Sequence, residues 1–413
     1  MSRLFANENG RVIPTLGEEL TQFRQAKTTF HVSTADEPSS LYILARPFPG
    51  GAWPLHIKIN NEQYTSINSN DHTRYRWYEI EVKPGVFQTG NNEVTLYTGA
   101  SAMNAWSLAL EPGHGTPVSS VSDDAGHTWR RENMGYLNAV RAEYVVRLRS
   151  ARGCDPNPPP LTMESVTHPK VIALRERVPK SITRRQSLLE RIQALATWVC
   201  MSWEHTGSGR ATQYAPWDAE TILSWGGART GHNGQRPIVM CVHYAVTFVS
   251  LCQALGIPAR CLALMGTPNG TDGHFVAEVW MPEFGKWVVV DPNADAMFFD
   301  GNEPMSAKEV QAAGEDLNPL VRWGSGSAYQ MTFSHIRLFV RENLLKNLCF
   351  RHISIWPHAN MLSQPQLSPP GHGSISYCET DLVWACEDRE RGFGMFRYFA
   401  DESYFNAEPE DYQ

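Results

Sequence analysis

Residues 241–260 read CVHYAVTFVSLCQALGIPAR, and this stretch decides the fold of the second half of the chain. The residues after Cys241 are mostly apolar, which predicts a strongly apolar helix. Gly256 is expected to end it, because glycine readily adopts the left-handed conformation that closes many helices. A polar, glycine-bearing loop precedes Cys241. The thiol is therefore expected at the helix N-terminus, where free amides and the helix dipole favour a thiolate.

Three strands are predicted after this helix. They are ARCLALMG (259–266), HFVAEVWM (274–281) and KWVVVDPN (286–293). His274 opens the second strand and Asp291 ends the third. A thiol nucleophile needs an imidazole within reach, and the imidazole needs a group that orients it. A strand–turn–strand unit can supply both, although the sequence leaves the strand register open.

The phrases around these residues resemble one known family. Residues 254–260 (ALGIPAR), 273–280 (GHFVAEVW) and 286–292 (KWVVVDP) follow in the order seen in the transglutaminase-like, papain-related cysteine hydrolases. Upstream, residues 192–203 resemble the helix that precedes the family's site, so the likeness covers about residues 190–300. It implies an α+β catalytic domain with Cys241 as nucleophile, His274 as general base and acid, and Asp291 as the orienting residue.

The sequence indicates the oxyanion hole less clearly than it indicates the three catalytic residues. The Cys241 backbone N–H is a natural donor. For a second donor two residues stay open: Gln235, six residues upstream as in papain-type enzymes, and Trp203, which matches by position the indole that transglutaminases use. Further residues expected to line the cleft are His232, Asn233 and Asp272.

His243 lies two residues after Cys241 in the predicted helix. Two helical residues span about 200°, so His243 is expected to point away from Cys241, as a capping or polar-surface histidine.

The sequence shows no known metal-binding motif. We find no HExxH motif, no paired carboxylates and no EF-hand-like loop. Thiol catalysis needs no metal, and the sequence predicts no metal site and no cofactor.

The rest of the chain predicts two flanking regions. Residues 1–152 are expected to form an all-β sandwich or jelly roll, with strands near 41–48, 56–60, 74–82 and 92–99 separated by Gly and Pro turns. A Pro-rich break at 153–160 precedes the catalytic domain, predicted at 160–320. Residues 321–413 are predicted to be a mixed extension that packs on it, with SHIRLFVREN (334–343) and LVWACED (382–388) as strands.

Two motifs bear on the N-terminal region. Lys83-Pro84-Gly85 followed by residues 89–94 (TGNNEV) resembles the lectin-like sandwiches appended to glycan-processing enzymes. This resemblance implies a glycan ligand for the N-terminal region. Residues 122–129 (SDDAGHTW) fit the S-x-D-x-G-x-T-W pattern, the Asp box. That pattern implies a tight structural hairpin, since Asp and Gly form the turn and Trp packs beneath it.

Composition excludes several classes of protein. The 413 residues suffice for two or three domains, and the net charge is −7. Basic runs are no longer than short clusters such as Arg184-Arg185, so we expect no nucleic-acid partner. No stretch reaches the ~18 apolar residues of a membrane span, and the N-terminus lacks a secretory signal, which predicts a cytoplasmic protein. Eight cysteines without a CxxC pair are too sparse for a disulfide scaffold.

Together these features predict a cysteine-dependent hydrolase of amide bonds that acts on a protein, peptide or glycopeptide. The resemblance includes protease-like members and a peptide N-glycanase branch. Two alternatives stay open: acyl transfer from glutamine to an amine, which uses the same acyl-enzyme, and an inactive scaffold that binds glycan or protein.

Overall fold

The computed structural model describes residues 4–5, 17–32, 35–36, 38–69, 75–112, 117–135, 138, 142–150, 165–206, 213–214, 217–226, 237–266, 273–356, 374–378, 396–400 and 402–409. The chain divides into two compact units. The first comprises Met1–Pro158 with Pro365–Ser374 and Asp388–Arg397, and the second comprises Pro159–Gln364 with Ile375–Glu387 and Tyr398–Gln413.

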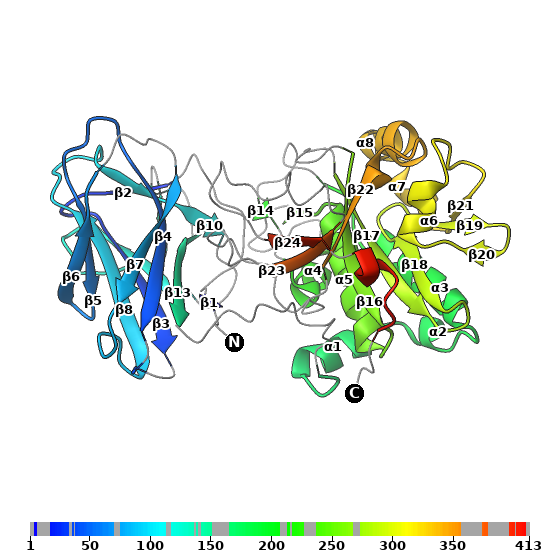
Figure 1. Ribbon diagram of the computed structural model, residues 1–413, viewed down its shortest axis with the longest axis horizontal. Helices are drawn as coiled ribbons and strands as arrows, with labels where there is room; N and C mark the ends of the chain where they lie inside the picture. Colours follow the sequence, from blue (N-terminus) through cyan, green and yellow to red (C-terminus); the bar gives the residue numbers. More distant parts are fainter. Residues whose placement is uncertain are drawn as a thin grey trace. The chain divides into compact units, whose positions relative to one another are not determined.

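In its described residues the first unit is built from strands (Figure 1). They are β1 (Leu4–Phe5), β2 (Glu18–Leu20), β3 (Gln25–Val32), β4 (Ser39–Pro47), β5 (Leu55–Ile59), β6 (Glu62–Ile67), β7 (Arg76–Val82), β8 (Gly90–Thr98), β9 (Trp106–Leu108), β10 (Leu110–Pro112), β11 (Ser119–Ser122), β12 (Ala142–Tyr144) and β13 (Val146–Ser150). The predicted strands at 41–48, 56–60, 74–82 and 92–99 correspond to β4, β5, β7 and β8, and are confirmed.

These strands form two main sheets. One has the order β1-β13-β4-β9-β2 with β7 beside β4, and the other has the order β11-β3-β8-β5-β6. Apolar side chains from both sheets share one buried cluster, to which Ile43 of β4 and Phe30 of β3 belong. Alternate residues of β5 are buried, as expected for strands with one face on a core.

The Asp-box residues form a tight turn after β11. The Asp124 carboxylate accepts hydrogen bonds from the Thr128 amide and from the Ser122 hydroxyl, each at 2.8 Å. Gly126 has φ +88°, a conformation that glycine adopts without strain. The Trp129 indole donates to the Gly126 carbonyl at 3.0 Å. The motif therefore serves as a structural staple in these contacts.

The second unit contains a nine-stranded sheet of order β20-β19-β18-β17-β16-β22-β23-β24, with β21 beside β19. Its strands are β16 (Ala259–Met265), β17 (His274–Met281), β18 (Lys286–Asp291), β19 (Ala296–Asp300), β20 (Glu303–Pro304), β21 (Val321–Trp323), β22 (His352–Trp356), β23 (Ser374–Cys378) and β24 (Phe396–Ala400). A separate parallel pair consists of β14 (Gln213–Tyr214) and β15 (Pro237–Ile238).

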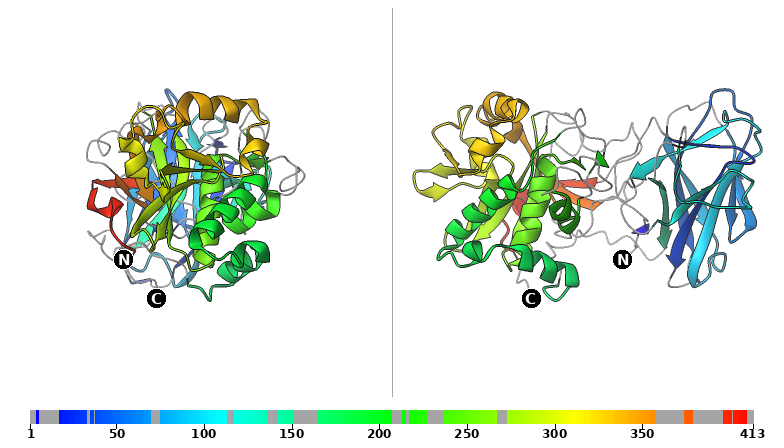
Figure 2. Two further views of the ribbon diagram at one scale, coloured as in Figure 1. Left: turned by 90° about the vertical axis from the view of Figure 1, so that its right-hand side faces the viewer. Right: turned by 180° about the vertical axis from the view of Figure 1, so that it is seen from behind.

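Helices pack around this sheet. They are α1 (Pro169–Arg177), α2 (Lys180–Thr183), α3 (Leu188–Met201), α4 (Ala219–Gly226), α5 (Cys241–Ala254), α6 (Ala307–Ala312), α7 (Ser327–Gln330), α8 (Ser334–Phe339), the π-helix η3 (Val340–Leu344) and the 3-10 turns η4 (Cys349–Arg351) and η5 (Glu402–Phe405). Helix α5 lies against β16 and β17, and α1, α3 and α4 contact α5 (Figures 1 and 2). In the described part of the chain, no helix is long and apolar enough to cross a membrane.

Helix α5 ends as its sequence predicts. Gly256 has φ +74°, and its amide donates to the Gln253 carbonyl at 2.9 Å. The next amide, of Ile257, donates to the Cys252 carbonyl at 2.9 Å. This pair of bonds is the Schellman arrangement, which satisfies carbonyls that the helix leaves unpaired.

The strand prediction for residues 334–343 is wrong, because this segment forms α8 and the start of η3. Ile336, Val340 and Leu344 recur every four residues, and all three are buried in one cluster with the sheet. The alternating letters HIRLFV masked this helical period. The predicted strand at 382–388 lies outside the described residues.

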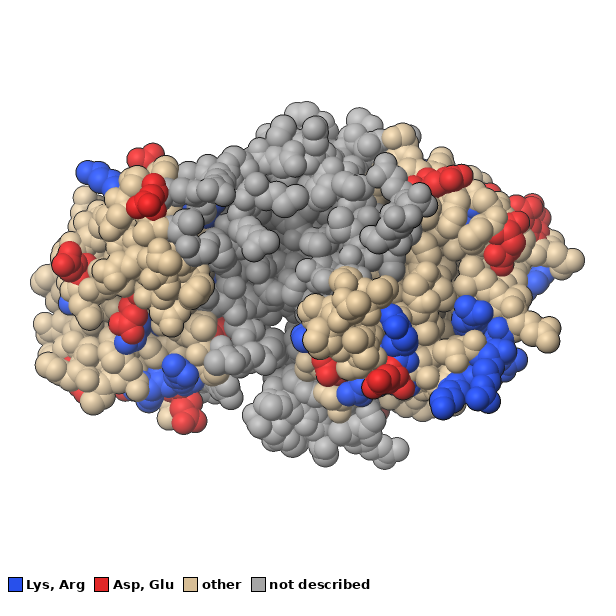
Figure 3. All heavy atoms as spheres, turned by 90° about the horizontal axis from the view of Figure 1, so that it is seen from below, with Lys and Arg blue, Asp and Glu red and all other residues tan. Residues whose placement is uncertain are grey.

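Basic side chains gather on the first helices of this unit. Arg175, Arg177, Lys180, Arg184 and Arg185 lie on or next to α1 and α2 and are exposed. Figure 3 shows Lys and Arg side chains gathered where these helices lie. None of them joins a salt bridge within the described residues. Arg175 donates to the backbone carbonyls of Ala254 and Val166, and the cluster is separate in sequence from the predicted catalytic residues.

Candidate active site

Cys241 is the first residue of α5, as predicted. Met240, the residue before it, is extended with φ −115° and ψ −178°. Cys241 is partly exposed, whereas the other cysteines for which burial is described are buried: Cys200, Cys252, Cys261 and Cys349. Burial raises the pKa of each of those four thiols. Cys241 thus differs from them in exposure and in its place at a helix N-terminus.

The strand register places His274 and Asp291 together. Ala277 pairs with Val290, and continuing this antiparallel register puts Asp291 opposite Val276, diagonal to His274 on the same face. His274 Nε2 lies 2.8 Å from Asp291 Oδ2, and both side chains are buried. Strand pairing of β17 with β18 therefore supplies the proximity that the sequence left open.

The electrostatics of His274 favour an imidazolium. Burial opposes the charged ring, but the Asp291 carboxylate and its hydrogen bond outweigh burial and raise the pKa of His274 to about 10. A hydrogen bond with the Cys241 side chain acts in the same direction. Because Nε2 is engaged by Asp291, Nδ1 is the nitrogen left for the sulfur.

The loop after β18 holds Asp291 firmly. Its Oδ1 accepts the backbone N–H groups of Asn293 and Ala294, each at 2.9 Å. Further along, the Asp295 carboxylate accepts from the Thr197 hydroxyl of α3 at 2.8 Å and from the Gly326 amide at 2.7 Å. Burial raises the pKa of Asp295 against these hydrogen bonds. The loop is thus anchored at both ends by buried carboxylates.

The segment that follows α3 lies beside the nucleophile. Thr206 and Val239 exchange two backbone hydrogen bonds, at 2.8 and 3.1 Å, so this segment runs next to the residue two before Cys241. Tyr244, on the first turn of α5, donates its hydroxyl to the Trp203 carbonyl at 2.9 Å. The Gln330 amide reaches the same carbonyl at 3.1 Å. The end of α3 is thereby clamped to the start of α5.

Trp203 is buried and packs on the Tyr244 ring, with 4.9 Å between ring centroids. Its indole Nε1 has no hydrogen-bond partner among the residues that the structure describes. Buried N–H groups nearly always have partners, and an exception calls for an explanation. The unpartnered donor is consistent with the oxyanion role that the resemblance implies for this residue.

His205 belongs to the same neighbourhood, and the sequence analysis missed it. Its Nδ1 lies 2.7 Å from the Asn293 side-chain oxygen, and its ring stacks on Tyr244 with 6.1 Å between centroids. Burial lowers the pKa of His205 to about 4, and the charges of His335 and His274 contribute in the same direction. Asn293 directly follows the Asp291-Pro292 phrase, but nothing in the sequence links it to His205.

The structure also tests the prediction for His243. This side chain is buried, and its Nδ1 accepts the backbone N–H of Met240 at 2.9 Å. The capping interpretation is confirmed and the polar-surface alternative is wrong. The remaining predicted cleft residues lie outside the described residues: Gln235, His232, Asn233 and Asp272.

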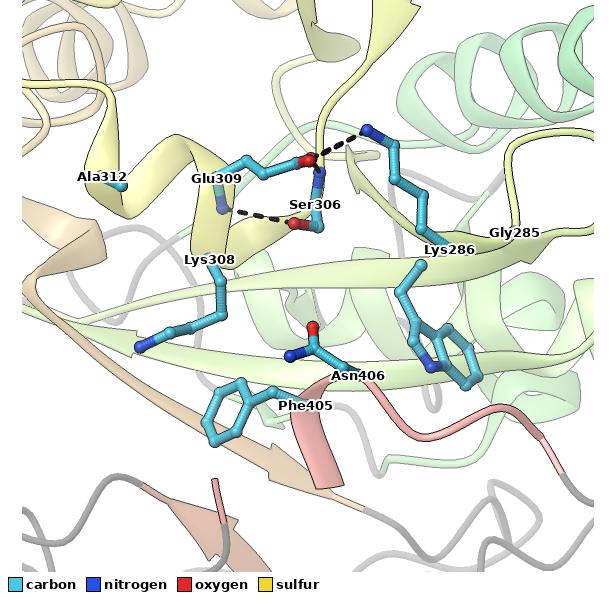
Figure 4. A pocket seen from close by; sticks show the side chains of 9 residues that line it. Gly285, Lys286, Ser306, Lys308, Glu309, Ala312, Phe405 and Asn406 are labelled. Carbon is cyan, nitrogen blue, oxygen red and sulfur yellow. Dashed lines mark hydrogen bonds and ion pairs between the residues drawn. The ribbon is translucent and has the colours of Figure 1, made fainter. Parts of the chain in front are cut away.

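The second unit also has a surface pocket away from the triad residues. Within the described ranges, no three His, Cys, Asp or Glu side chains converge as metal ligands would. A surface pocket of about 300 Å³ lies near the C-terminal segment (Figure 4). Lys286, one of its lining residues, forms an ion pair with Glu309 at 3.0 Å. The pocket includes none of the predicted catalytic residues. Its lining is Gly285, Lys286, Trp287, Ser306, Lys308, Glu309, Ala312, Phe405 and Asn406.

Two solved structures illustrate the comparison with known proteins. A "Putative Cysteine Protease" from Cytophaga hutchinsonii is 12% identical over 71% of this chain and 79% of that chain, with a TM-score of 0.24. The transglutaminase of red sea bream is 13% identical over 79% of this chain and 58% of that chain, with a TM-score of 0.24. No curated protein matches the chain. The family match comes from sequence: residues 176–292 match the transglutaminase-like superfamily. The chain therefore carries a domain of the transglutaminase-like superfamily over these residues.

Proposed function

We propose that the second unit is a cysteine-dependent hydrolase of amide bonds, with Cys241, His274 and Asp291 as its catalytic triad. The observation that carries this proposal is the 2.8 Å contact between buried His274 Nε2 and Asp291 Oδ2, with Cys241 engaging the same ring. A nucleophile, a base and an orienting carboxylate in this order are the elements of covalent acyl transfer.

The reaction proceeds in two steps. The Cys241 thiolate attacks the carbonyl carbon of the substrate, forming a C–S bond and a tetrahedral oxyanion. His274 then gives its proton to the nitrogen as the C–N bond breaks, which releases an amine or ammonia. Water, deprotonated by His274, attacks the thioester carbonyl, and the C–S bond breaks to release the carboxylic acid and restore the Cys241 thiolate beside the His274 imidazolium. Asp291 holds the ring in position and stabilises its positive charge throughout.

Two donors are proposed for the oxyanion: the Cys241 backbone N–H and the Trp203 indole N–H. The Cys241 amide is at the start of α5, where helix amides have no partner within the helix. The Trp203 indole is buried without a partner in the described residues. Such donors, held in place before the reaction, stabilise charge as it develops. Gln235 remains the alternative second donor.

The substrate class proposed is protein or peptide, in keeping with the superfamily. Hydrolysis and transfer to an amine share the thioester, and the release of ammonia measured with and without an added amine separates them. We also propose that the first unit is a β-sandwich, because side chains of its two sheets share one buried cluster. The glycan ligand suggested by its sequence stays a prediction.

The alkylation rate of each cysteine by iodoacetamide, measured against pH by peptide mass spectrometry, tests the triad. In the wild type, Cys241 is expected to react well below pH 7, because an imidazolium partner and a helix N-terminus stabilise a thiolate. In His274→Ala this reactivity at low pH should be lost. Buried Cys252 and Cys261 of the same chain serve as internal controls and should stay slow. If Cys241 reacts like an ordinary thiol in both proteins, the proposed catalysis is refuted.

A further inference from the structure

His205 lies among elements that carry all three proposed catalytic residues. Its segment runs beside Val239, two residues before Cys241. Its ring stacks on Tyr244, which is three residues after Cys241 and so on the same side of α5. Asn293, which holds the ring, is two residues after Asp291. The ring is therefore held by Asn293 and Tyr244, and its segment runs beside the residue two before Cys241.

The contact with Asn293 settles which ring nitrogen carries the proton. A carboxamide oxygen can only accept, so at 2.7 Å the His205 Nδ1 must donate to it. Asn293 is itself held, since its backbone N–H donates to Asp291 Oδ1 at 2.9 Å. In the neutral ring Nε2 then carries a lone pair. Among the described residues no hydrogen bond to Nε2 is found, and Nε2 is not one of the buried polar atoms that lack a partner.

We propose that His205 determines specificity: its Nε2 accepts a hydrogen bond from the N–H of the scissile amide, so that the site favours amides over esters. This inference rests on the proposed function. A low pKa, about 4, keeps the ring neutral and its lone pair available near pH 7. Trp203 and His205 both pack on the Tyr244 ring, and together they offer one N–H donor and one acceptor, which is the pattern that complements an amide group.

The contact also fits the chemistry of the leaving group. When the tetrahedral intermediate forms, the amide nitrogen becomes pyramidal and gains a basic lone pair. A hydrogen bond from its N–H to His205 would fix the orientation of that nitrogen and leave the lone pair for the His274 proton. No proton is transferred to His205 in this step. An ester has no N–H and cannot use the contact.

A matched pair of variants separates the Nε2 contact from the Nδ1 contact. His205→Asn keeps an amide near Nδ1, which can bond Asn293, but removes the acceptor at Nε2. His205→Gln places an amide oxygen near the position of Nε2. His335→Ala is the control, because it removes the exposed ring 5.3 Å from His205 and leaves the bond with Asn293 intact.

The probes are p-nitroanilides and p-nitrophenyl esters of N-acetylated alanine, phenylalanine, glutamine and lysine, paired by acyl group. For His205→Asn we expect kcat/KM on the amides to fall about tenfold to a hundredfold, with the esters within about twofold of wild type. His205→Gln should recover part of the amide activity, and His335→Ala should change neither. Circular dichroism and the alkylation rate of Cys241 show whether each variant is folded with its nucleophile in place.

Each other outcome overturns a defined claim. An equal fall on amides and esters in His205→Asn, or no fall on either, overturns the role of His205 and leaves the proposed hydrolase intact. A loss in His335→Ala as large as in His205→Asn also overturns it, because the effect would then be one of packing. A wild-type protein that turns over no probe, with Cys241 unreactive at low pH, overturns the proposed function and this inference together.

Discussion

Replacing Asp291 by Asn tests the electrostatic core of the site with little change in shape. The carboxamide oxygen can still accept the Asn293 and Ala294 amides that now bind Oδ1. Its NH2 group, however, would face His274 Nε2, which now lies 2.8 Å from a carboxylate. The ring would then have to present a lone pair at Nε2. Asp291→Asn therefore removes the negative charge of residue 291 and changes the tautomer of His274, while the hydrogen bonds that hold the loop after β18 are kept.

The expected cost follows from the bonds that are lost. A hydrogen bond to a charged partner contributes about 1.5–3 kcal/mol, and breaking a buried ion pair costs about 3–5 kcal/mol. The backbone hydrogen bonds from Asn293 and Ala294 to residue 291 remain. His274 can also lose its proton, so that no unpaired charge is left buried. We therefore expect Asp291→Asn to lower the free energy of unfolding at pH 7 by about 2–3 kcal/mol, the lower part of this range.

The pH dependence has a defined sign. The folded pKa of His274 is raised from 6.5 to about 10, so the folded protein binds more protons than the unfolded chain between these values. Its contribution to stability is complete below about pH 6.5 and is lost as pH rises towards 10. In Asp291→Asn burial acts without the carboxylate, so this loss of stability with rising pH should disappear.

Urea unfolding, followed by pulse labelling of the buried cysteines, measures this effect. Cys200, Cys252, Cys261 and Cys349 all lie in the second unit, so their exposure reports on that unit alone. A cycle of wild type, Asp291→Asn, His274→Ala and the double variant gives the coupling energy between the two residues, expected at about 2 kcal/mol at pH 7. A coupling energy below about 0.5 kcal/mol would refute the reasoning. So would a free energy of unfolding that falls as much with rising pH in Asp291→Asn as in the wild type.

Two further predictions concern the supports of the site. Trp203→Phe keeps a ring against Tyr244 but removes the unpartnered N–H. It should therefore lower kcat about a hundredfold on any substrate, while the free energy of unfolding in urea stays near the wild-type value. An unchanged kcat would favour Gln235 as the donor. In Gly324→Ala the new Cβ would overlap the Asp295 carboxylate, so stability should fall by about 1–3 kcal/mol and Cys241 should become less reactive. Urea unfolding and alkylation rates check the second variant, and wild-type values for both would contradict it.

The sequence by itself determined the elements whose signals are local. The helix from Cys241 to Gly256 follows from its apolar run and its terminal glycine, because helix endings depend on a few neighbouring residues. The strands that carry His274 and Asp291 follow from their β-branched and aromatic residues. Local pattern misled where it supports two periods: residues 334–343 form a helix because Ile336 and Val340 are buried on one face.

Only the tertiary structure decided how these elements meet. His274 and Asp291 are 17 residues apart, and their contact depends on the register of β17 with β18. His205 and Asn293 are 88 residues apart, and no periodicity in either segment encodes their 2.7 Å contact. Periodicity specifies which face of an element is buried, while the packing of the whole unit selects which distant side chains that face meets. For this reason the sequence could nominate Cys241, His274 and Asp291, whereas His205 and its partner emerged only from the fold.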